Sequence, residues 1–200
     1  MKTFKKIETI QKPMLVIEYD DSVPSPREDT NLGYFITVDS KLNSPDTKEQ
    51  LENIMRASGD EAQNQEDHIQ IMANLINTET NEQVIAIYPI TKYEHSGISF
   101  SLGTTKGFDN SNNGFYIITD KTLKEFDEGL SKNTGGQKDV IQAELEEYNK
   151  WINGEVYRFT LYDNKGEEID ACGGFYDLEA VQQNLPVDWA KEDLNDYIIY

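Results

Sequence analysis

The sequence has a single cysteine, Cys172, among its 200 residues. One cysteine cannot form an internal disulfide, and its isolation is typical of a protein kept in a reducing compartment. The two histidines, His68 and His95, could add at most two nitrogen ligands to that thiol, and no C-x-x-C or H-E-x-x-H motif is present. The sequence therefore argues against a disulfide-rich secreted domain and against a zinc protein, and it predicts no cofactor.

Basic residues are also scarce. The chain has 18 Lys and Arg against 37 Asp and Glu, which gives a formal net charge of -19. Each contact with a nucleic-acid phosphate needs a cation, so direct binding to DNA or RNA is not expected. The charge favours a basic protein as the partner, because opposite charge accelerates association.

Long apolar runs are absent as well. No stretch is long and apolar enough to predict a membrane-spanning helix, and the first residues show no apolar segment of the kind that directs secretion. We therefore expect a cytoplasmic protein without a membrane partner. With 11 Tyr, 8 Phe and 2 Trp, the chain nevertheless has enough large apolar side chains to build a core, which excludes a disordered protein.

Apolar periodicity predicts an α+β fold. Strand-like runs occupy residues 14–19, 32–38, 84–93, 98–102 and 114–119, and a hairpin is expected over 155–172 around the turn 163–166. Helical spacing covers residues 44–58, the stretch around 69–76, and residues 119–130, 139–154, 177–185 and 187–200. Ser44 and Pro45 resemble the cap and first position of the first helix. No long linker is evident, so we expect one domain over residues 1–200, with a mixed or mainly antiparallel sheet and four to six helices packed on it.

The segment DNSNNGFYIITD, residues 109–120, resembles part of a calcium loop. The spacing of an EF-hand is matched by Asp109, Ser111, Asn113, Gly114 and Asp120. The ninth position is Ile117, which has no side-chain oxygen, and the flanking sequence is not helical, so an EF-hand is excluded. We expect a turn in which Gly114 takes a positive φ, and a calcium-dependent binding module at 109–120 remains the alternative.

A nucleophile is conceivable at Cys172. His95 could activate the thiol, Asp170 or Glu94 could orient the imidazole, and the N–H groups of Gly173 and Gly174 could bind an oxyanion. A lone cysteine is more often a packed apolar residue, so this cysteine-dependent hydrolase is kept as an alternative and no catalytic residue is predicted. The glycine- and lysine-containing stretches 103–107 and 134–138 lack the spacing of a phosphate loop and are predicted to be turns.

Three segments resemble one protein family. They are SPREDTNLG (25–33), YEHSGISFSLGTTKGFDNSNNGFYII (93–118) and NGEVYRFTLYDNKGEEIDACGGFY (153–176). Their order and spacing are similar to small acidic proteins carried by bacterial phages, plasmids and integrative elements, which show P-R-E, Y-D-H-S-G and D-S-C-W-G-F-Y motifs. Ala171 and Gly173 stand where the last motif has Ser and Trp. The resemblance implies an accessory gene of a mobile element, and such genes often counter host defence.

Mimicry of DNA would require the acids to share one face. Nineteen net charges equal the phosphates along roughly 32 Å of duplex, whereas an even spread leaves about one net charge per 500 Å². Partner-binding candidates are Glu125, Asp127, Glu128, Asp139, Glu144, Glu146, Glu147, Asp188, Glu192, Asp193 and Asp196. The predicted function is a non-enzymatic counter-defence inhibitor of anti-CRISPR or antirestriction type. It would bind a basic, DNA-handling host defence protein in the bacterial cytoplasm.

Overall fold

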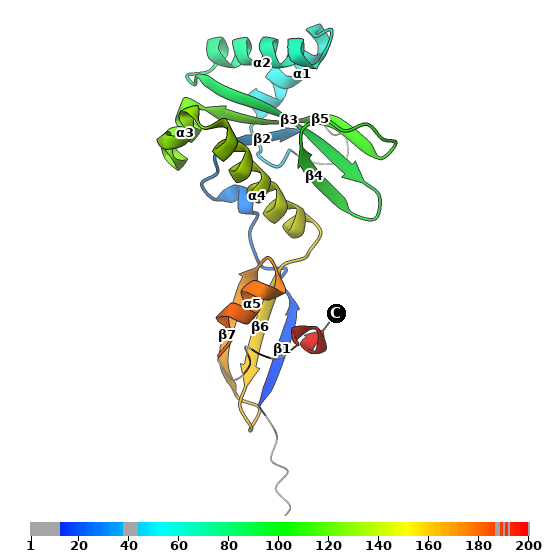
Figure 1. Cartoon of the computed structure of the whole chain (residues 1–200), viewed down its shortest axis with the longest axis vertical. Coiled ribbons are helices and arrows are strands. Elements are labelled where there is room, and N and C mark those ends of the chain that lie inside the picture. The colour runs from blue at the N-terminus through cyan, green and yellow to red at the C-terminus, as the bar shows by residue number, and fades with distance from the viewer. Residues whose placement is uncertain (1–12, 38–43, 187–188, 190, 192, 200) are drawn as a thin grey trace, which may run out of the picture. The chain divides into compact units, whose positions relative to one another are not determined.

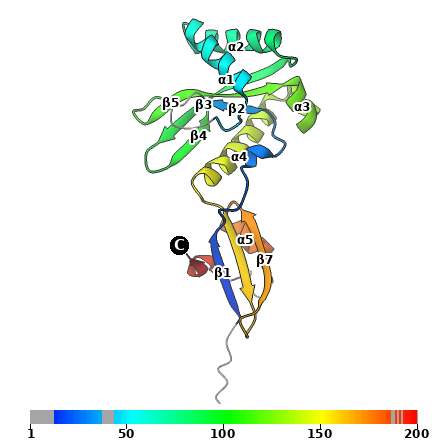
Figure 2. The ribbon, with the colours of Figure 1, turned by 180° about the vertical axis from the view of Figure 1, so that it is seen from behind.

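The computed structural model describes residues 13–37, 44–186, 189, 191 and 193–199. The chain divides into two compact units (Figures 1 and 2). One unit is Ser25–Asn153, and the other combines Met1–Pro24 with Gly154–Tyr200. Each unit has its own four-stranded sheet.

The sheet of the Ser25–Asn153 unit has the strand order β2-β5-β3-β4. These strands are β2 (Tyr34–Thr37), β5 (Asn110–Thr119), β3 (Val84–Glu94) and β4 (Ile98–Leu102), and every neighbouring pair is antiparallel. β5 is therefore a central strand, flanked by β2 and β3.

Helices cover both faces of this sheet, so the unit has three layers (Figure 1). On one face, α1 (Glu49–Glu61) and α2 (Gln65–Glu79) pack against inward residues of β5 such as Phe115. On the other face, α3 (Asp120–Phe126) and α4 (Thr134–Ile152) pack on the next residue along, Tyr116. Successive side chains of a strand point to opposite faces, which explains why the run GFYIIT is apolar throughout.

Asn149 of α4 and Asn153, the residue that caps its C-terminus, protect the outer edge of β4. The Asn149 side chain accepts a hydrogen bond from the N–H of Phe100 at 2.7 Å and donates one to its carbonyl at 2.9 Å. Asn153 does the same with the N–H and carbonyl of Ile98, at 3.0 and 2.7 Å. The two amides thus take the place of a neighbouring strand, which satisfies an edge that could otherwise pair with another chain.

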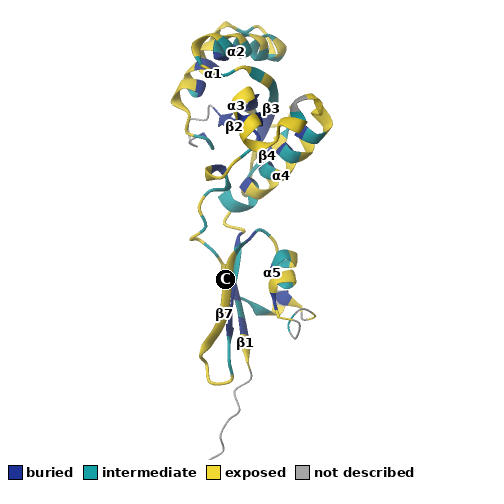
Figure 3. Ribbon diagram, turned by 90° about the vertical axis from the view of Figure 1, so that its left-hand side faces the viewer, coloured by how far each residue is buried: buried dark blue, intermediate teal, exposed yellow. Residues whose placement is uncertain are grey.

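The second sheet has the order β7-β6-β1-β8. It contains β7 (Glu168–Phe175), β6 (Tyr157–Tyr162), β1 (Met14–Tyr19) and β8 (Ile198–Ile199), and the β1–β8 pair is its one parallel pairing among the described strands. Its core also includes Val181 and Leu185, from α5 (Leu178–Asn184) and the residue after it, and Leu194 from a 3-10 turn, Leu194–Tyr197. Figure 3 shows that β7 is largely exposed.

The α+β class, the mainly antiparallel pairing and the number of helices are confirmed, with five α-helices in the described residues. The single sheet that we expected is in fact two sheets. Residues 14–19 and 98–102 form strands with the predicted bounds. The 163–166 turn joins β6 and β7 as predicted, and Gly166 has a φ of +84°.

Some predicted boundaries were wrong. The first helix starts at Glu49 because Ser44 and Asp46 are engaged elsewhere: the Ser44 hydroxyl accepts a hydrogen bond from the N–H of Thr37. α4 begins at Thr134, not 139, since Asn133 caps it by accepting from the N–H of Gly136 at 2.9 Å. The helix predicted over 187–200 is instead the 3-10 turn followed by β8, and residues 187, 188, 190, 192 and 200 lie outside the described part.

None of the helices in the described residues is both long enough and apolar enough to cross a membrane.

Replacing Asn149 by Ala should lower the free energy of unfolding by about 1–3 kcal/mol, because two partly buried backbone groups of Phe100 lose their partner. Gln142→Ala is a matched control on the same helix, since its exposed amide contacts Glu146 alone. That change should stay within about 0.5 kcal/mol. Urea unfolding measures both, and equal effects would contradict the edge-protecting role.

Candidate functional site

Arg27 is a buried cation with several polar partners in the Ser25–Asn153 unit. It lies in a short 3-10 turn, Pro26–Glu28, which begins where the Ser25 hydroxyl accepts a hydrogen bond from the N–H of Arg27 at 3.2 Å. The proline sets the backbone angle of the turn. The Arg27 side chain is 2% exposed, which is rare for a charged group without partners.

All five N–H donors of the guanidinium are used. Nε and Nη2 form a fork on the Asp46 carboxylate, at 3.2 and 2.8 Å. Nη1 donates to Asn31 Oδ1 at 2.8 Å and to Glu144 Oε2 at 2.7 Å, and Nη2 also donates to the Gly33 carbonyl at 2.7 Å. A buried charge is tolerated when its partners are complete, and here they are.

Glu144 extends the network to the sheet. Its Oε1 accepts a hydrogen bond from the N–H of Leu32 at 2.9 Å, and its Oε2 accepts from the Tyr116 hydroxyl as well as from Arg27. The Tyr116 hydroxyl in turn accepts from the N–H of Gly33 at 2.9 Å. The network therefore ties the 25–33 segment to α4 and to β5.

Arg27 and Tyr116 are not suited to proton transfer near neutral pH. Burial alone would lower the pKa of Arg27, but the hydrogen bond and charge of Asp46, with the charges of Tyr116 and Glu144, outweigh it and raise the pKa. Burial and the charge of Glu144 raise the pKa of Tyr116 well above its usual value. Arg27 stays charged and Tyr116 stays neutral, so neither serves as a general acid or base.

A groove of about 280 Å³ opens beside this network. We call it the acidic groove, and its lining residues are Arg27, Glu28, Asp29, Thr30, Asn31, Gly33, Tyr34, Asp46, Lys48, Thr122 and Glu125. The exposed acids are Glu28, Asp29 and Glu125. Arg27 is already paired, and the Lys48 ammonium lies 5.4 Å from the centre of the Tyr34 ring. The groove therefore presents more negative than positive charge to solvent.

Glu147 of α4 lies close to the groove. Burial is the largest cause that raises the pKa of Glu147. The charges of Glu144 and Asp29 raise this pKa further, and the charge of Lys150 lowers it. Acids from two separate parts of the sequence, Asp29 and the α4 pair Glu144 and Glu147, thus influence one another electrostatically. On the α3 side, Glu125 is positioned by a helix whose cap is Thr119, and the hydroxyl of Thr119 accepts from the N–H of Thr122 at 3.3 Å.

The predicted partner-binding residues are distributed unevenly around this groove. Glu125 lines it and Glu147 lies near it. Glu144 was wrongly placed on the partner surface, because its carboxylate points inward to Arg27 and Tyr116. Figure 3 shows exposed and buried residues alternating along α4, where Asp139 and Glu146 are exposed two turns apart.

The remaining predicted acids lie elsewhere. Asp127 and Glu128 are exposed at the 3-10 turn Glu128–Lys132, where Asp127 Oδ1 accepts from the N–H of Gly129 at 2.8 Å. Asp193 and Asp196 are exposed in the other unit. Asp188 and Glu192 lie outside the described residues.

Sequence reasoning missed Glu28, Asp29 and Asp46. The signal that could have found Glu28 was the P-R-E segment of the family resemblance. In that segment Arg27 is followed directly by two acids, Glu28 and Asp29, in a proline-containing turn. Asp46 could not be found in this way, because its link to Arg27 spans 19 residues and local rules assigned it to a helix start.

The cysteine alternative gains no support. Cys172 is exposed on β7, in a unit whose sequence contains no histidine. His95 belongs to the Ser25–Asn153 unit, where its Nδ1 lies 3.7 Å from Asp109 Oδ2. The N–H of Gly174 donates to Asp20 Oδ2 at 3.1 Å, so it is not free for an oxyanion. A Cβ added at Gly173 would meet the same carboxylate, so the Asp20 side chain would have to move.

The calcium-binding alternative at residues 109–120 gains no support either. Residues Asn110–Thr119 form β5, so the expected turn is a strand. Gly114 does not take the positive φ that we predicted, because it is paired with Thr37 and Ile90 inside the sheet. Asn112 Oδ1 accepts hydrogen bonds from Thr91 and Thr105. Across the described residues, no three His, Cys, Asp or Glu side chains are grouped as metal ligands would be.

Comparison of the chain with protein-family models, with curated proteins and with solved structures finds no match. The function proposed below therefore depends on the geometry of the acidic groove, the charge of the chain and the resemblance of its three segments.

Replacing Arg27 by Met should lower the free energy of unfolding by about 3–5 kcal/mol, because Asp46 and Glu144 lose a buried partner. Arg158→Met is the matched control, since its guanidinium lies 3.5 Å from Glu18 in a solvent-accessible pair. That pair should contribute about 0–1 kcal/mol. Urea unfolding followed by circular dichroism distinguishes them, and similar losses would refute the central role of Arg27.

Alkaline pH should destabilise this unit through its buried tyrosines. Burial, with the charge of Asp46, raises the pKa of Tyr148 to about 12, against an ordinary value of 10.0. Between those values the folded chain keeps a proton that the unfolded chain releases, so stability is complete below pH 10 and falls as pH rises toward 12. Tyr148→Phe should reduce that slope by about 1.4 kcal/mol per pH unit. Parallel pH profiles of the two proteins would contradict this.

Proposed function

We propose that this chain is a non-catalytic inhibitor from a bacterial mobile element that binds a basic, nucleic-acid-binding defence protein of its host. The observation that carries the proposal is the acidic groove. There, Glu28, Asp29 and Glu125 come from segments about a hundred positions apart and surround one concave surface. The resemblance to mobile-element proteins supports the biological setting, which is the cytoplasm of the bacterial host.

The charges of the groove favour a cationic partner over any anion. Arg27 cannot reach out to a ligand, because Asp46 and Glu144 hold its guanidinium on both sides. The exposed carboxylates are therefore left to interact with Lys and Arg side chains of another protein. Those cations are the groups that hold phosphates in a DNA-handling enzyme, so the inhibitor would compete with DNA.

Rigidity supports the same function. The groove wall formed by residues 28–33 is anchored by Arg27 and by the bonds of Glu144 and Tyr116 to the N–H groups of Leu32 and Gly33. Carboxylates on an anchored segment lose little conformational entropy on binding, which improves affinity. Glu147, Asp139 and Glu146 would extend the contact along α4.

The test removes four charges at the groove. In the variant, Glu28, Glu125 and Glu147 are changed to Gln and Asp29 to Asn, and competition with labelled duplex DNA is measured on a panel of purified CRISPR nucleases and restriction enzymes. Affinity for the inhibited enzyme should fall about a hundredfold or more, since each desolvated charge pair contributes roughly 1 kcal/mol. Rising salt should weaken the wild-type complex as well.

A matched control removes four charges from the opposite layer of the same unit. Asp60, Glu61, Glu66 and Glu79 of α1 and α2 are exposed, and changing Asp60 to Asn and the other three to Gln gives the same net charge. This variant should inhibit nearly as well as the wild type. Equal losses in the two variants would show that only net charge matters, and salt-independent binding would contradict an electrostatic interface.

A further inference from the structure

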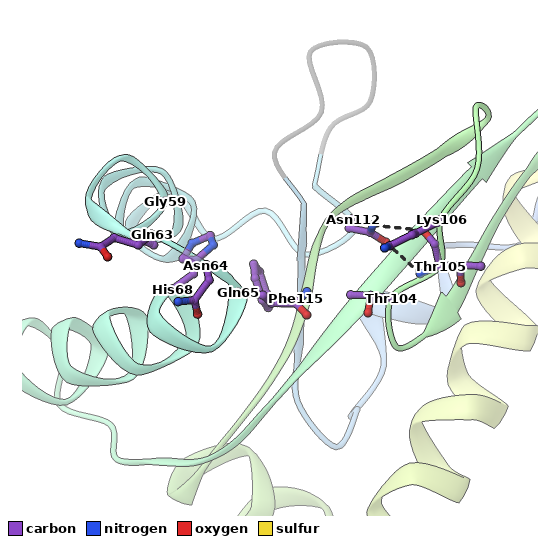
Figure 4. Close-up of a pocket in the computed structure, with 11 residues that line it drawn as sticks. Gly59, Gln63, Asn64, Gln65, His68, Thr104, Thr105, Lys106, Asn112 and Phe115 are labelled. Atoms are coloured by element: carbon purple, nitrogen blue, oxygen red, sulfur yellow. Dashed lines mark hydrogen bonds between the residues drawn. The ribbon is translucent and has the colours of Figure 1, made fainter.

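A second and larger cavity, of about 480 Å³, lies in the Ser25–Asn153 unit between the α1–α2 turn and the β4–β5 loop (Figure 4). Its lining residues are Gly59, Ala62, Gln63, Asn64, Gln65, His68, Thr104, Thr105, Lys106, Asn112 and Phe115. The volume is within the range of small-molecule sites, roughly 300–1,000 Å³.

The cavity differs from the rest of the molecule in charge. None of its 11 lining residues is Asp or Glu, although the chain has 37 of these acids. The ionisable side chains of the lining are Lys106 and His68. The acidic groove is lined by Glu28, Asp29, Asp46 and Glu125, so the present cavity is more compatible with an anionic ligand than that groove is.

One wall is fixed by hydrogen bonds. Asn112 Oδ1 accepts from the N–H of Thr105 at 3.2 Å, and Asn112 Nδ2 donates to the Thr105 carbonyl at 3.2 Å (Figure 4). The Thr91 hydroxyl accepts a further bond from the N–H of Thr105 at 3.0 Å and donates to Asn112 Oδ1 at 2.6 Å. The stretch from Thr104 to Lys106 is thereby held against β5 and β3, with its side chains at the cavity.

The opposite wall carries three consecutive amide side chains, Gln63, Asn64 and Gln65. Asn64 Oδ1 caps α2 by accepting from the N–H of Asp67 at 3.0 Å, which leaves its NH₂ group for other partners. Within the described residues, the side chains of Gln63, Gln65, Thr104 and Lys106 form no hydrogen bond or ion pair. Gln63, Gln65, Thr104 and Lys106 thus leave donors and acceptors available on both sides of the cavity.

Rings and small residues form the base between these walls. His68 Nε2 lies 3.0 Å from the Met55 carbonyl, and because a carbonyl can only accept, this nitrogen carries a proton. The His68 ring meets Phe115 edge-on, with centroids 4.9 Å apart. A Cβ at Gly59 would lie 3.3 Å from the imidazole, so the glycine leaves room for the ring. Phe115 is only 2% exposed, so the ring surface that the base offers to a ligand comes mainly from His68.

We propose that this cavity binds a phosphorylated small molecule of nucleotide size. The phosphate lies at Thr104–Lys106, where two hydroxyls and an ammonium supply donors. The planar base of the ligand packs toward Phe115 and His68, and the amides of Gln63, Asn64 and Gln65 bond its polar edge, as amide side chains do with bases. This site is independent of the acidic groove, so neither proposal depends on the other.

Isothermal titration calorimetry of the full chain with the four ribonucleoside 5′-monophosphates tests the site. Inorganic phosphate and the matching nucleosides serve as half-ligands. At least one monophosphate should bind with a Kd below about 1 mM, and more tightly than phosphate or its nucleoside. Lys106→Gln should weaken that binding about tenfold or more, whereas Lys165→Gln, on the β6–β7 turn, should leave it unchanged.

Amide chemical shifts give a second readout. On addition of the tightest monophosphate, the signals of Thr104, Thr105 and Lys106 should move, together with those of Asn64 and Gln65. No binding by any monophosphate would overturn the proposal. Equal affinity for inorganic phosphate would replace it with a bare anion site, and equal weakening by Lys106→Gln and Lys165→Gln would show non-specific charge attraction.

Discussion

The Ser25–Asn153 unit depends on the buried guanidinium of Arg27. Its five donors connect Asp46, Asn31, Gly33 and Glu144, and Glu144 adds Tyr116 of the central strand. The partners are distant in sequence, with 117 positions between Arg27 and Glu144. A buried charge whose hydrogen bonds are all satisfied permits few alternative arrangements of its partners. Loss of the guanidinium or of its carboxylate partners leaves an uncompensated buried ion. Arg27 thus fixes where α4 lies against the 25–33 segment.

The same interaction determines which acids remain for a partner. Asp46 and Glu144 form ion pairs with Arg27 and are not available to a partner. The neighbouring acids Glu28, Asp29 and Glu147 face solvent or one another. The acidic composition of the chain alone therefore does not determine where the acidic groove lies. The ion pairs of Arg27 withdraw one cation and two carboxylates from the surface, and the groove stays negative because Glu28, Asp29 and Glu125 remain exposed. In contrast, the cavity between the α1–α2 turn and the β4–β5 loop has no Asp or Glu among its lining residues.

Local signals in the sequence predicted much of the fold. Residues 14–19 alternate as a strand should, and the 163–166 turn has its own Asp163 cap on the N–H groups of Lys165 and Glu167. Predictions failed where a distant partner decided the outcome. Asp46 does not begin a helix as predicted, because its carboxylate binds Arg27. Gly114, which was predicted to lie in a turn, instead pairs with Thr37 and Ile90 in the sheet. For the site, composition identified Glu125 and Glu147, but only the folded arrangement separates them from the inward-facing Glu144.

Hydrogen exchange on the chain, alone and bound to a defence nuclease that it inhibits, tests the central claim most directly. Binding through the acidic groove predicts slower exchange at the backbone amides of residues 28–34 and of α3, with α1 and α2 unchanged. Those helices pack on the opposite face of the sheet, so they report binding on that face. Protection confined to α1 and α2, with the groove amides exchanging as in the free chain, would contradict the account.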